Sequence, residues 1–194
     1  MQNVVRSFVD DARTILAHGP TDDALAQLMA RMRLLIRHPT VLEDHEAFLA
    51  RSATDGSTLY ADVGRKSEVL YTDETGLTLV RSRFFPDQAT PVHSHGTWGV
   101  LGVYAGQDLH QSYVRRDSGS GAGTAELELI EESVLAAGDV ALIPRPPQDI
   151  HQQQGYGGEP ESEPVLCGKN ATVIPRLIFD VAAKTAREVV PGQG

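Results

Sequence analysis

The sequence predicts a mainly β protein, a sandwich or barrel that carries a helical cap at its N-terminus. Through the first fifty positions, apolar residues recur at three- and four-residue intervals, as on one face of an amphipathic helix. From about residue 57, short apolar runs alternate with Gly, Pro, Asp and Ser, which is typical of many short strands joined by close turns. The 194 residues suit one domain, with helices over 1–52, a barrel over 57–182 and a C-terminal tail over 183–194.

Three helices are expected in the cap. The first ends at Gly19 and Pro20, and its apolar face comprises Val5, Phe8, Val9, Ala12, Ile15 and Leu16. The second begins at Thr21, a capping residue followed by two acidic residues that favour the positive end of the helix dipole. A third, shorter helix is expected from Thr40, which has the spacing of a capping box with Glu43.

The clearest expected strands cover 77–80, 100–104, 127–130, 140–143 and 177–179. Turn-forming residues separate them, as in the segments DETG, YAGQD and AAGD. Two segments rich in glycine and polar residues, 117–123 and 155–170, are expected to be mobile loops, and Cys167 falls in the second.

Composition excludes several classes of function. The formal charge of −9 and the pI near 5.2 would repel a phosphate backbone, so nucleic acid is not an expected partner. No run approaches the roughly 20 apolar residues of a membrane span, and the N-terminal residues have early acidic groups and no apolar core of an export signal. With the single Cys167, no internal disulfide can form. We therefore expect a cytoplasmic protein, and the sequence makes no prediction of oligomeric state.

Three of the seven histidines form the candidate metal site. His93 and His95 lie two apart in a predicted strand, so they share a face and can bind one ion. Pro91 is tolerated where such a strand begins. His151 is the best third ligand, because the turn, strand and proline of GDVALIP should bring it alongside the pair. The remaining histidines, His18, His38, His45 and His110, are expected to be surface or capping residues.

Two segments carry a resemblance to a known family. TPVHSHGTWGVLGVYAG, residues 90–106, and GDVALIPRPPQDIHQ, residues 138–152, resemble the two sequence motifs of cupins. More narrowly, they resemble thiol dioxygenases related to cysteine dioxygenase and 3-mercaptopropionate dioxygenase. The resemblance covers about residues 60–152. It implies a cupin double-stranded β-helix, or jelly-roll barrel, in which His93, His95 and His151 bind iron(II).

The reaction that this resemblance implies is the oxidation of a small carboxylate-bearing thiol to a sulfinate by dioxygen. Many metal cupins have a glutamate ligand four residues beyond the second histidine, where this chain has Gly99. Three neutral imidazoles leave the charge of the ion uncompensated and leave coordination positions open, which favours an anionic chelating ligand. Imidazole suits several first-row metals, so the choice of iron rests on the resemblance.

The expected substrate contacts are arginines. The resemblance places a carboxylate-binding arginine on an early strand, near Arg65. Arg81 and Arg83 share a strand face with Leu77 and Leu79. They are substrate anchors if that face looks into the barrel, and solvent-exposed residues if a bulge intervenes.

The late part of the chain departs from the family pattern. Thiol dioxygenases carry a Ser-x-His-x-Tyr run on a late strand, and the corresponding strand here is expected at 175–179, where Pro, Leu and Phe replace those residues. The segment 155–164 is either a lid whose Tyr156 supplies the missing hydroxyl or a disordered surface loop.

Two other functions remain open from the sequence. One keeps the three-histidine metal site but makes the protein an oxygenase or isomerase for an enolate or β-dicarbonyl chelate. The other is a non-catalytic cupin that binds a small acid as a sensor or store. The fold alone does not choose among them, because such barrels host many functions.

Overall fold

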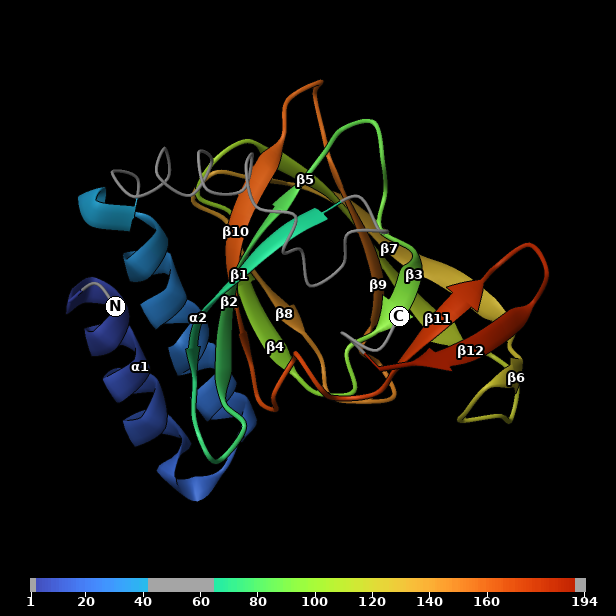
Figure 1. The fold of residues 1–194 in the computed structure, drawn as a ribbon, viewed down its shortest axis with the longest axis horizontal. Helices are drawn as coiled ribbons and strands as arrows, with labels where there is room; N and C mark the ends of the chain where they lie inside the picture. The colour runs from blue at the N-terminus through green and yellow to red at the C-terminus, as the bar shows by residue number, and fades with distance from the viewer. Residues whose placement is uncertain (1–2, 42–64, 191–194) are drawn as a thin grey trace.

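The computed structural model describes residues 3–41 and 65–190, with the side chains of the second range from residue 67 onward (Figure 1). Helix α1 (Asn3–Ile15) leads through a short 3-10 turn, η1 (Leu16–His18), to helix α2 (Asp22–Ile36). The predicted cap of α2 is confirmed, because the Thr21 hydroxyl accepts a hydrogen bond from the Ala24 N–H at 3.1 Å. Most of the third expected helix, including Glu43, and the helix-to-barrel boundary at 52–57 lie outside the described residues.

Twelve strands follow within residues 65–190. They are β1 (Arg65–Thr72), β2 (Thr78–Phe84), β3 (Val92–Ser94), β4 (Gly99–Gly102), β5 (Gln107–Arg115), β6 (Gly123–Thr124), β7 (Leu127–Ala136), β8 (Val140–Ile143), β9 (Ile150–Gly155), β10 (Glu161–Cys167), β11 (Arg176–Asp180) and β12 (Thr185–Val189). All pairings are antiparallel. The first sheet has the order β1-β2-β10-β4-β8 and the second has the order β6-β12-β11-β3-β9-β5-β7.

The order of the strands is that of a jelly roll. Four strands of the first sheet, β2-β10-β4-β8, face four of the second, β3-β9-β5-β7, and along these eight strands the chain changes sheet at every step except the one from β5 to β7. This is the eight-stranded arrangement of a double-stranded β-helix. The predicted fold class, a mainly β cupin barrel with an N-terminal helical cap, is therefore confirmed.

The helices cover the outer face of the first sheet (Figure 1). Leu79 of β2, Val100 of β4 and Leu166 of β10 belong to the same apolar core as the buried faces of α1 and α2. Gly102 allows this contact, because a Cβ there would lie 2.8 Å from the Met32 Cγ. Among the described residues, no helix is long and apolar enough to cross a membrane.

The inner face of the first sheet carries the alternate residues of each strand. Val80, Leu101, Ile143, Val165 and Cys167 pack together there. Because side chains alternate along a strand, the neighbours of these residues on β2 and β10 face the helices instead. This assignment of faces decides which polar residues enter the barrel.

Two predictions about irregular segments were wrong. Residues 161–167 are not a loop but strand β10, whose seven residues are all buried. Acidic Glu161 and Glu163 make the segment look like a surface loop, but they alternate with Ser162 and Pro164 as in a strand. The expected C-terminal tail, 183–194, includes strand β12, which pairs with β11. Ala186 of β12 is buried in the apolar core on the outer side of the second sheet.

Candidate metal centre

Three histidines converge between the two sheets. His93 on β3 is the direct register partner of His151 on β9, and His95 follows the end of β3. The ring centroids of His93 and His95 are each 4.7 Å from that of His151. One ligand nitrogen from each of the three lies within 4.8 Å of the others, and all three side chains are buried.

The hydrogen bonds of the three imidazoles fit a metal site. The main-chain oxygen of Pro91 lies 3.0 Å from the His93 Nδ1, so it can accept the Nδ1–H and leave the Nε2 lone pair for an ion. Within the described part of the chain, both ring nitrogens of His151 are buried and have no hydrogen-bond partner. A buried polar atom without a partner is costly, and coordination of an ion would satisfy one of these nitrogens.

The electrostatics favour a neutral imidazole at His151. Burial, followed by the neighbouring His93 and His95, holds the pKa of His151 well below its ordinary value. A neutral imidazole has the free lone pair that a metal ion requires. Together with the geometry, this means that the donor set fits a first-row divalent ion.

Asp149 joins the two ligand-bearing segments. Its Oδ2 accepts a hydrogen bond from the Gly96 N–H at 2.6 Å, and its main-chain oxygen accepts one from the His95 N–H at 3.3 Å. Asp149 is buried and lies two residues before His151. One residue therefore holds the segment of His95 against the segment of His151.

At Gly99, where many metal cupins have a glutamate ligand, neighbouring atoms leave little space for a side chain. A Cβ built on Gly99 would lie 3.1 Å from the Ile143 Cδ1 and 3.4 Å from the Leu166 main-chain oxygen. No carboxylate belongs to the cluster of histidines among the residues that the structure describes. The three-histidine character expected from Gly99 therefore agrees with the geometry.

A fourth histidine, His110, lies beside the site. It was expected at the surface, but it is buried on β5, and its ring centroid is 5.0 Å from that of His151. Its Nδ1 lies 3.2 Å from the Oδ2 of Asp108, which is fully buried. The spacing Asp108-Leu109-His110 places both polar residues on one strand face. This spacing is the signal in the sequence that could have marked His110 as a site residue.

The other lone histidines divide differently. His18 and His38 are exposed, as expected, and the Nδ1 of His38 accepts a hydrogen bond from the Thr40 N–H at 3.3 Å. His45 lies outside the described residues.

The structure places Arg81 and Arg83 on the helix-facing side of β2, together with Leu79. Arg81 is buried there, and its Nη2 lies 2.7 Å from the Glu68 Oε2. Arg83 is half-buried, with its Cζ 5.3 Å from the centroid of the Phe85 ring. Neither arginine is brought together with the histidines, and Arg81 is not a solvent-exposed residue either.

The remaining candidate substrate contacts are Arg65 and Tyr156. Arg65 begins β1 opposite Phe84, and its side chain lies outside the described part of the structure. Tyr156 is 46% exposed and lies just past the C-terminal end of β9, whereas His151 is near the other end of that strand. The structure therefore does not bring Tyr156 to the metal centre.

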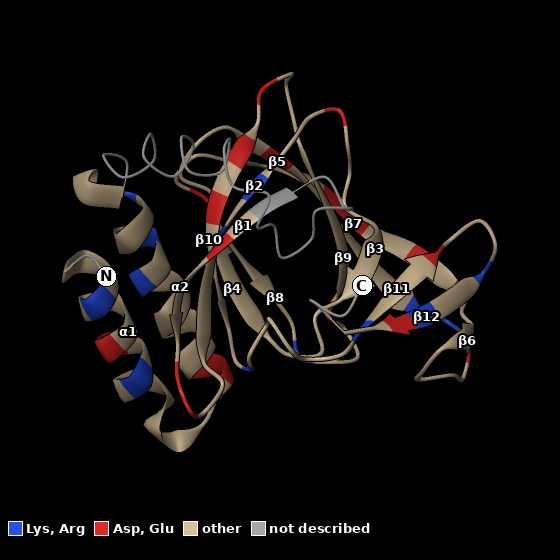
Figure 2. Cartoon of the chain, viewed as in Figure 1, with Lys and Arg blue, Asp and Glu red and all other residues tan. Residues whose placement is uncertain are grey.

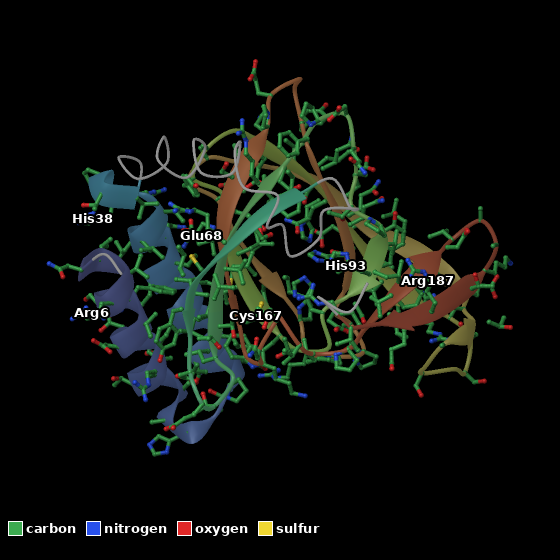
Figure 3. The ribbon with its side chains drawn as sticks, viewed as in Figure 1. Arg6, His38, Glu68, His93, Cys167 and Arg187 are labelled. Carbon is green, nitrogen blue, oxygen red and sulfur yellow. The ribbon has the colours of Figure 1, made fainter. Side chains whose placement is uncertain are left out.

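Cys167 was expected in a loop, but it ends β10 and faces the barrel. Its Sγ lies 4.0 Å from the His95 Nδ1. Figure 3 shows Cys167 and His93 on opposite sheets, near the space between the sheets.

The strand that follows His151 in the chain is β10. Residues 175–179, where the Ser-His-Tyr run was expected, belong almost entirely to β11, which lies beside β3. On β10 the residues that face the interior include Glu163, Val165 and Cys167. None of these three is the serine, histidine or tyrosine of the family's relay, so the relay is absent from this strand as well.

No protein-family model and no curated protein matches this sequence. Solved structures do match. An oxalate oxidase is 22% identical with a TM-score of 0.46, over 62% of this chain and 58% of the other chain. A cupin-like protein from Thermotoga maritima is 19% identical with a TM-score of 0.39, over 59% and 75% of the two chains. KdgF from Halomonas sp. is 14% identical with a TM-score of 0.39, over 55% and 82%. This chain thus spans less than two thirds of the oxalate oxidase, and the chemistry of the site is argued from its own residues.

Proposed function

We propose that this protein is an iron(II)-dependent dioxygenase that oxidises the thiol of a small chelating substrate to a sulfinate. One observation carries the proposal: His93, His95 and His151 converge as buried ligands, and their cluster includes no carboxylate among the described residues. A divalent ion in this set keeps its full charge. An anionic sulfur ligand is therefore stabilised more strongly than at a site that includes a glutamate.

The reaction requires only dioxygen as co-substrate. A thiol, RSH, and O₂ give the sulfinate RSO₂⁻ and a proton. Both oxygen atoms are transferred to sulfur, which loses the four electrons that dioxygen gains. When bound, iron would supply the redox centre at which the thiolate and dioxygen are held together.

The protein residues orient the site and move the proton. The hydrogen bond that His93 Nδ1–H donates to the Pro91 main-chain oxygen and the clamp of Asp149 hold the imidazoles in position. Asp108 fixes the Nδ1–H of His110, so the His110 Nε2 retains the lone pair that accepts the thiol proton. Ile143 and Val165 are buried in the apolar part of the inner face, where they exclude water.

The test is oxygen consumption by the iron-loaded protein with a panel of small thiols and β-dicarbonyl compounds, with mass spectrometry of the products. We expect thiol-dependent uptake, a product heavier by both atoms of O₂, and loss of both in His151→Ala. The exposed His18→Ala is the matched control and should retain activity.

Three outcomes would contradict the proposal. Uptake with dicarbonyl compounds alone would favour the enolate oxygenase or isomerase. Binding of a small acid by a protein that takes up no metal would favour a sensor or store. Absence of thiol-dependent uptake by protein that has bound its full complement of iron would refute the thiol dioxygenase.

A further inference from the structure

The barrel contains a group of buried acidic residues that the proposed reaction does not use. Glu161 and Glu163 occupy alternate positions of β10, and both are fully buried. They share a face with Val165 and Cys167, which belong to the inner cluster. Figure 2 shows acidic residues within β10 itself, inside the sheet rather than in the connecting loops.

This acidic group is connected to the metal centre. Gln153 lies two residues after His151 on β9, so the two side chains share a strand face. The Gln153 Nε2 donates to the Glu163 Oε1 and to the Asp108 Oδ2, both at 3.1 Å. Glu163 is thus next along the barrel from the histidines, at the end opposite to Cys167, which contacts His95.

The side-chain amide of Gln153 is shared between two neighbouring carboxylates, Asp108 and Glu163. Asp108 accepts from Gln153, from the Gln154 N–H and from His110. The amide of Gln153 has two protons, and they serve Asp108 and Glu163. Both carboxyl oxygens of Glu161 are buried and have no hydrogen-bond partner among the residues that the structure describes. No ion pair within the described part of the chain involves Glu161.

An uncompensated carboxylate in a protein interior is strongly disfavoured. Burial, with the charges of Glu163 and Asp108, raises the pKa of Glu161 well above its ordinary value. Two states relieve this cost. The carboxyl holds a proton, or a cation lies beside it. A cation with several N–H donors would satisfy both oxygens of Glu161.

We propose that Glu161 and Glu163 form a subsite for a cationic group, an ammonium or a guanidinium, of the substrate that binds the metal. The inference rests on the proposed function, and it names the substrate class: a small thiol with a nitrogen cation at its far end. An acidic cluster alone would not define a site. Here the orphaned carboxylate of Glu161 and the contact of Gln153 with Glu163 point to a ligand beside the metal centre.

The test compares three thiols of similar size that differ at the far end: 2-aminoethanethiol, 2-mercaptoethanol and 3-mercaptopropionate. Affinities are measured by anaerobic calorimetry of the metal-loaded protein, and kcat/KM is measured by oxygen uptake. We expect the amine to bind about tenfold or more tightly than the alcohol, since a hydrogen bond between charged partners exceeds a neutral one by about this factor. The acid should bind least well of the three.

The variants are Glu161→Gln and Glu163→Gln, with the exposed Glu131→Gln of β7 as matched control. Each barrel variant should reduce the amine preference about tenfold and leave the alcohol unaffected, whereas the control should keep the wild-type preference. Equal affinity of the wild-type protein for amine and alcohol would overturn the subsite, and so would an unchanged preference in both barrel variants. The wild-type comparison decides the matter even where a variant does not fold.

The failures of the two proposals are distinguishable. An amine preference in calorimetry without oxygen uptake would leave the subsite standing and refute the dioxygenase. Oxygen uptake without an amine preference, or with a preference for the acid, would support the dioxygenase and refute the subsite.

Discussion

Removal of one imidazole should eliminate most of the stabilisation that a metal ion gives to this barrel. A ligand present at a hundredfold its Kd stabilises the folded state by about 2.7 kcal/mol. For a domain of this size each kcal/mol shifts the Tm by about 2–4 °C, so iron(II) should raise the Tm by roughly 5–11 °C. Loss of a partner outside the coordination sphere typically weakens metal affinity by about 10–100-fold. Loss of His151 itself should weaken it at least as much.

With a hundredfold weaker Kd at the same concentration of iron, the stabilisation falls to about 0.4 kcal/mol, or about 1–2 °C. The measurement is anaerobic thermal unfolding of wild type and His151→Ala with and without iron(II), together with the metal content after desalting. His18→Ala, a histidine that is exposed on the cap, should behave as wild type. The reasoning is refuted if His151→Ala retains the full metal-dependent increase in Tm.

Four further predictions concern the surroundings of the site. Asp149→Ala should cost about 1–3 kcal/mol of unfolding free energy and weaken metal binding, because the Gly96 N–H loses its acceptor. Urea unfolding would measure the first effect and metal titration the second. An unchanged metal affinity would argue against the clamp. Gly102→Ala should lower the free energy of unfolding by about 1–3 kcal/mol, because the new Cβ pushes α2 away from β4. The control Gly121→Ala has open space around it and should change this free energy by no more than about 0.5 kcal/mol. Thermal unfolding of both variants measures the difference. His110→Ala should retain bound iron but lower kcat/KM for thiols by about 10²–10⁴-fold, and loss of iron instead would make His110 a ligand. The raised pKa of Glu161 means that the ligand-free folded state binds more protons than the unfolded chain above about pH 4.5. Stability should therefore fall as the pH rises from that value through the folded pKa, and Glu161→Gln should show a flatter dependence in urea unfolding at pH 5 and pH 8.

The features that could be predicted from the sequence are those with a local signal. The cap of α2 depends on Thr21 and the residues directly after it, and both lie within one turn of helix. The pair of His93 and His95 depends on a spacing of two along one strand. The third ligand, His151, follows a turn and a strand that return the chain to β3. In each case neighbouring residues carry the information.

His110 and β10 depend on contacts between segments that are distant in the sequence. The spacing of Asp108 and His110 places them on one strand face, but only the pairing of β5 with β9 brings His110 next to His151. Residues 161–167 look like a loop because their charge and proline content are those of exposed segments. Their burial results from pairing with β2 on one side and β4 on the other, and these partners are distant in the sequence.

The same reasoning explains the arginines and the glutamates. Alternation along a strand tells which residues share a face, but it does not tell which of the two faces looks into the barrel. Arg81 and Arg83 were correctly grouped with Leu79, yet that face packs against the helices, and the opposite face of the same sheet carries Glu161 and Glu163. In this barrel the helical cap decides the question, because it buries one apolar face from outside and leaves the other face to line the interior. The proposed subsite therefore reverses the sign of the charge expected to bind the substrate, from cationic anchors on β2 to acidic ones on β10.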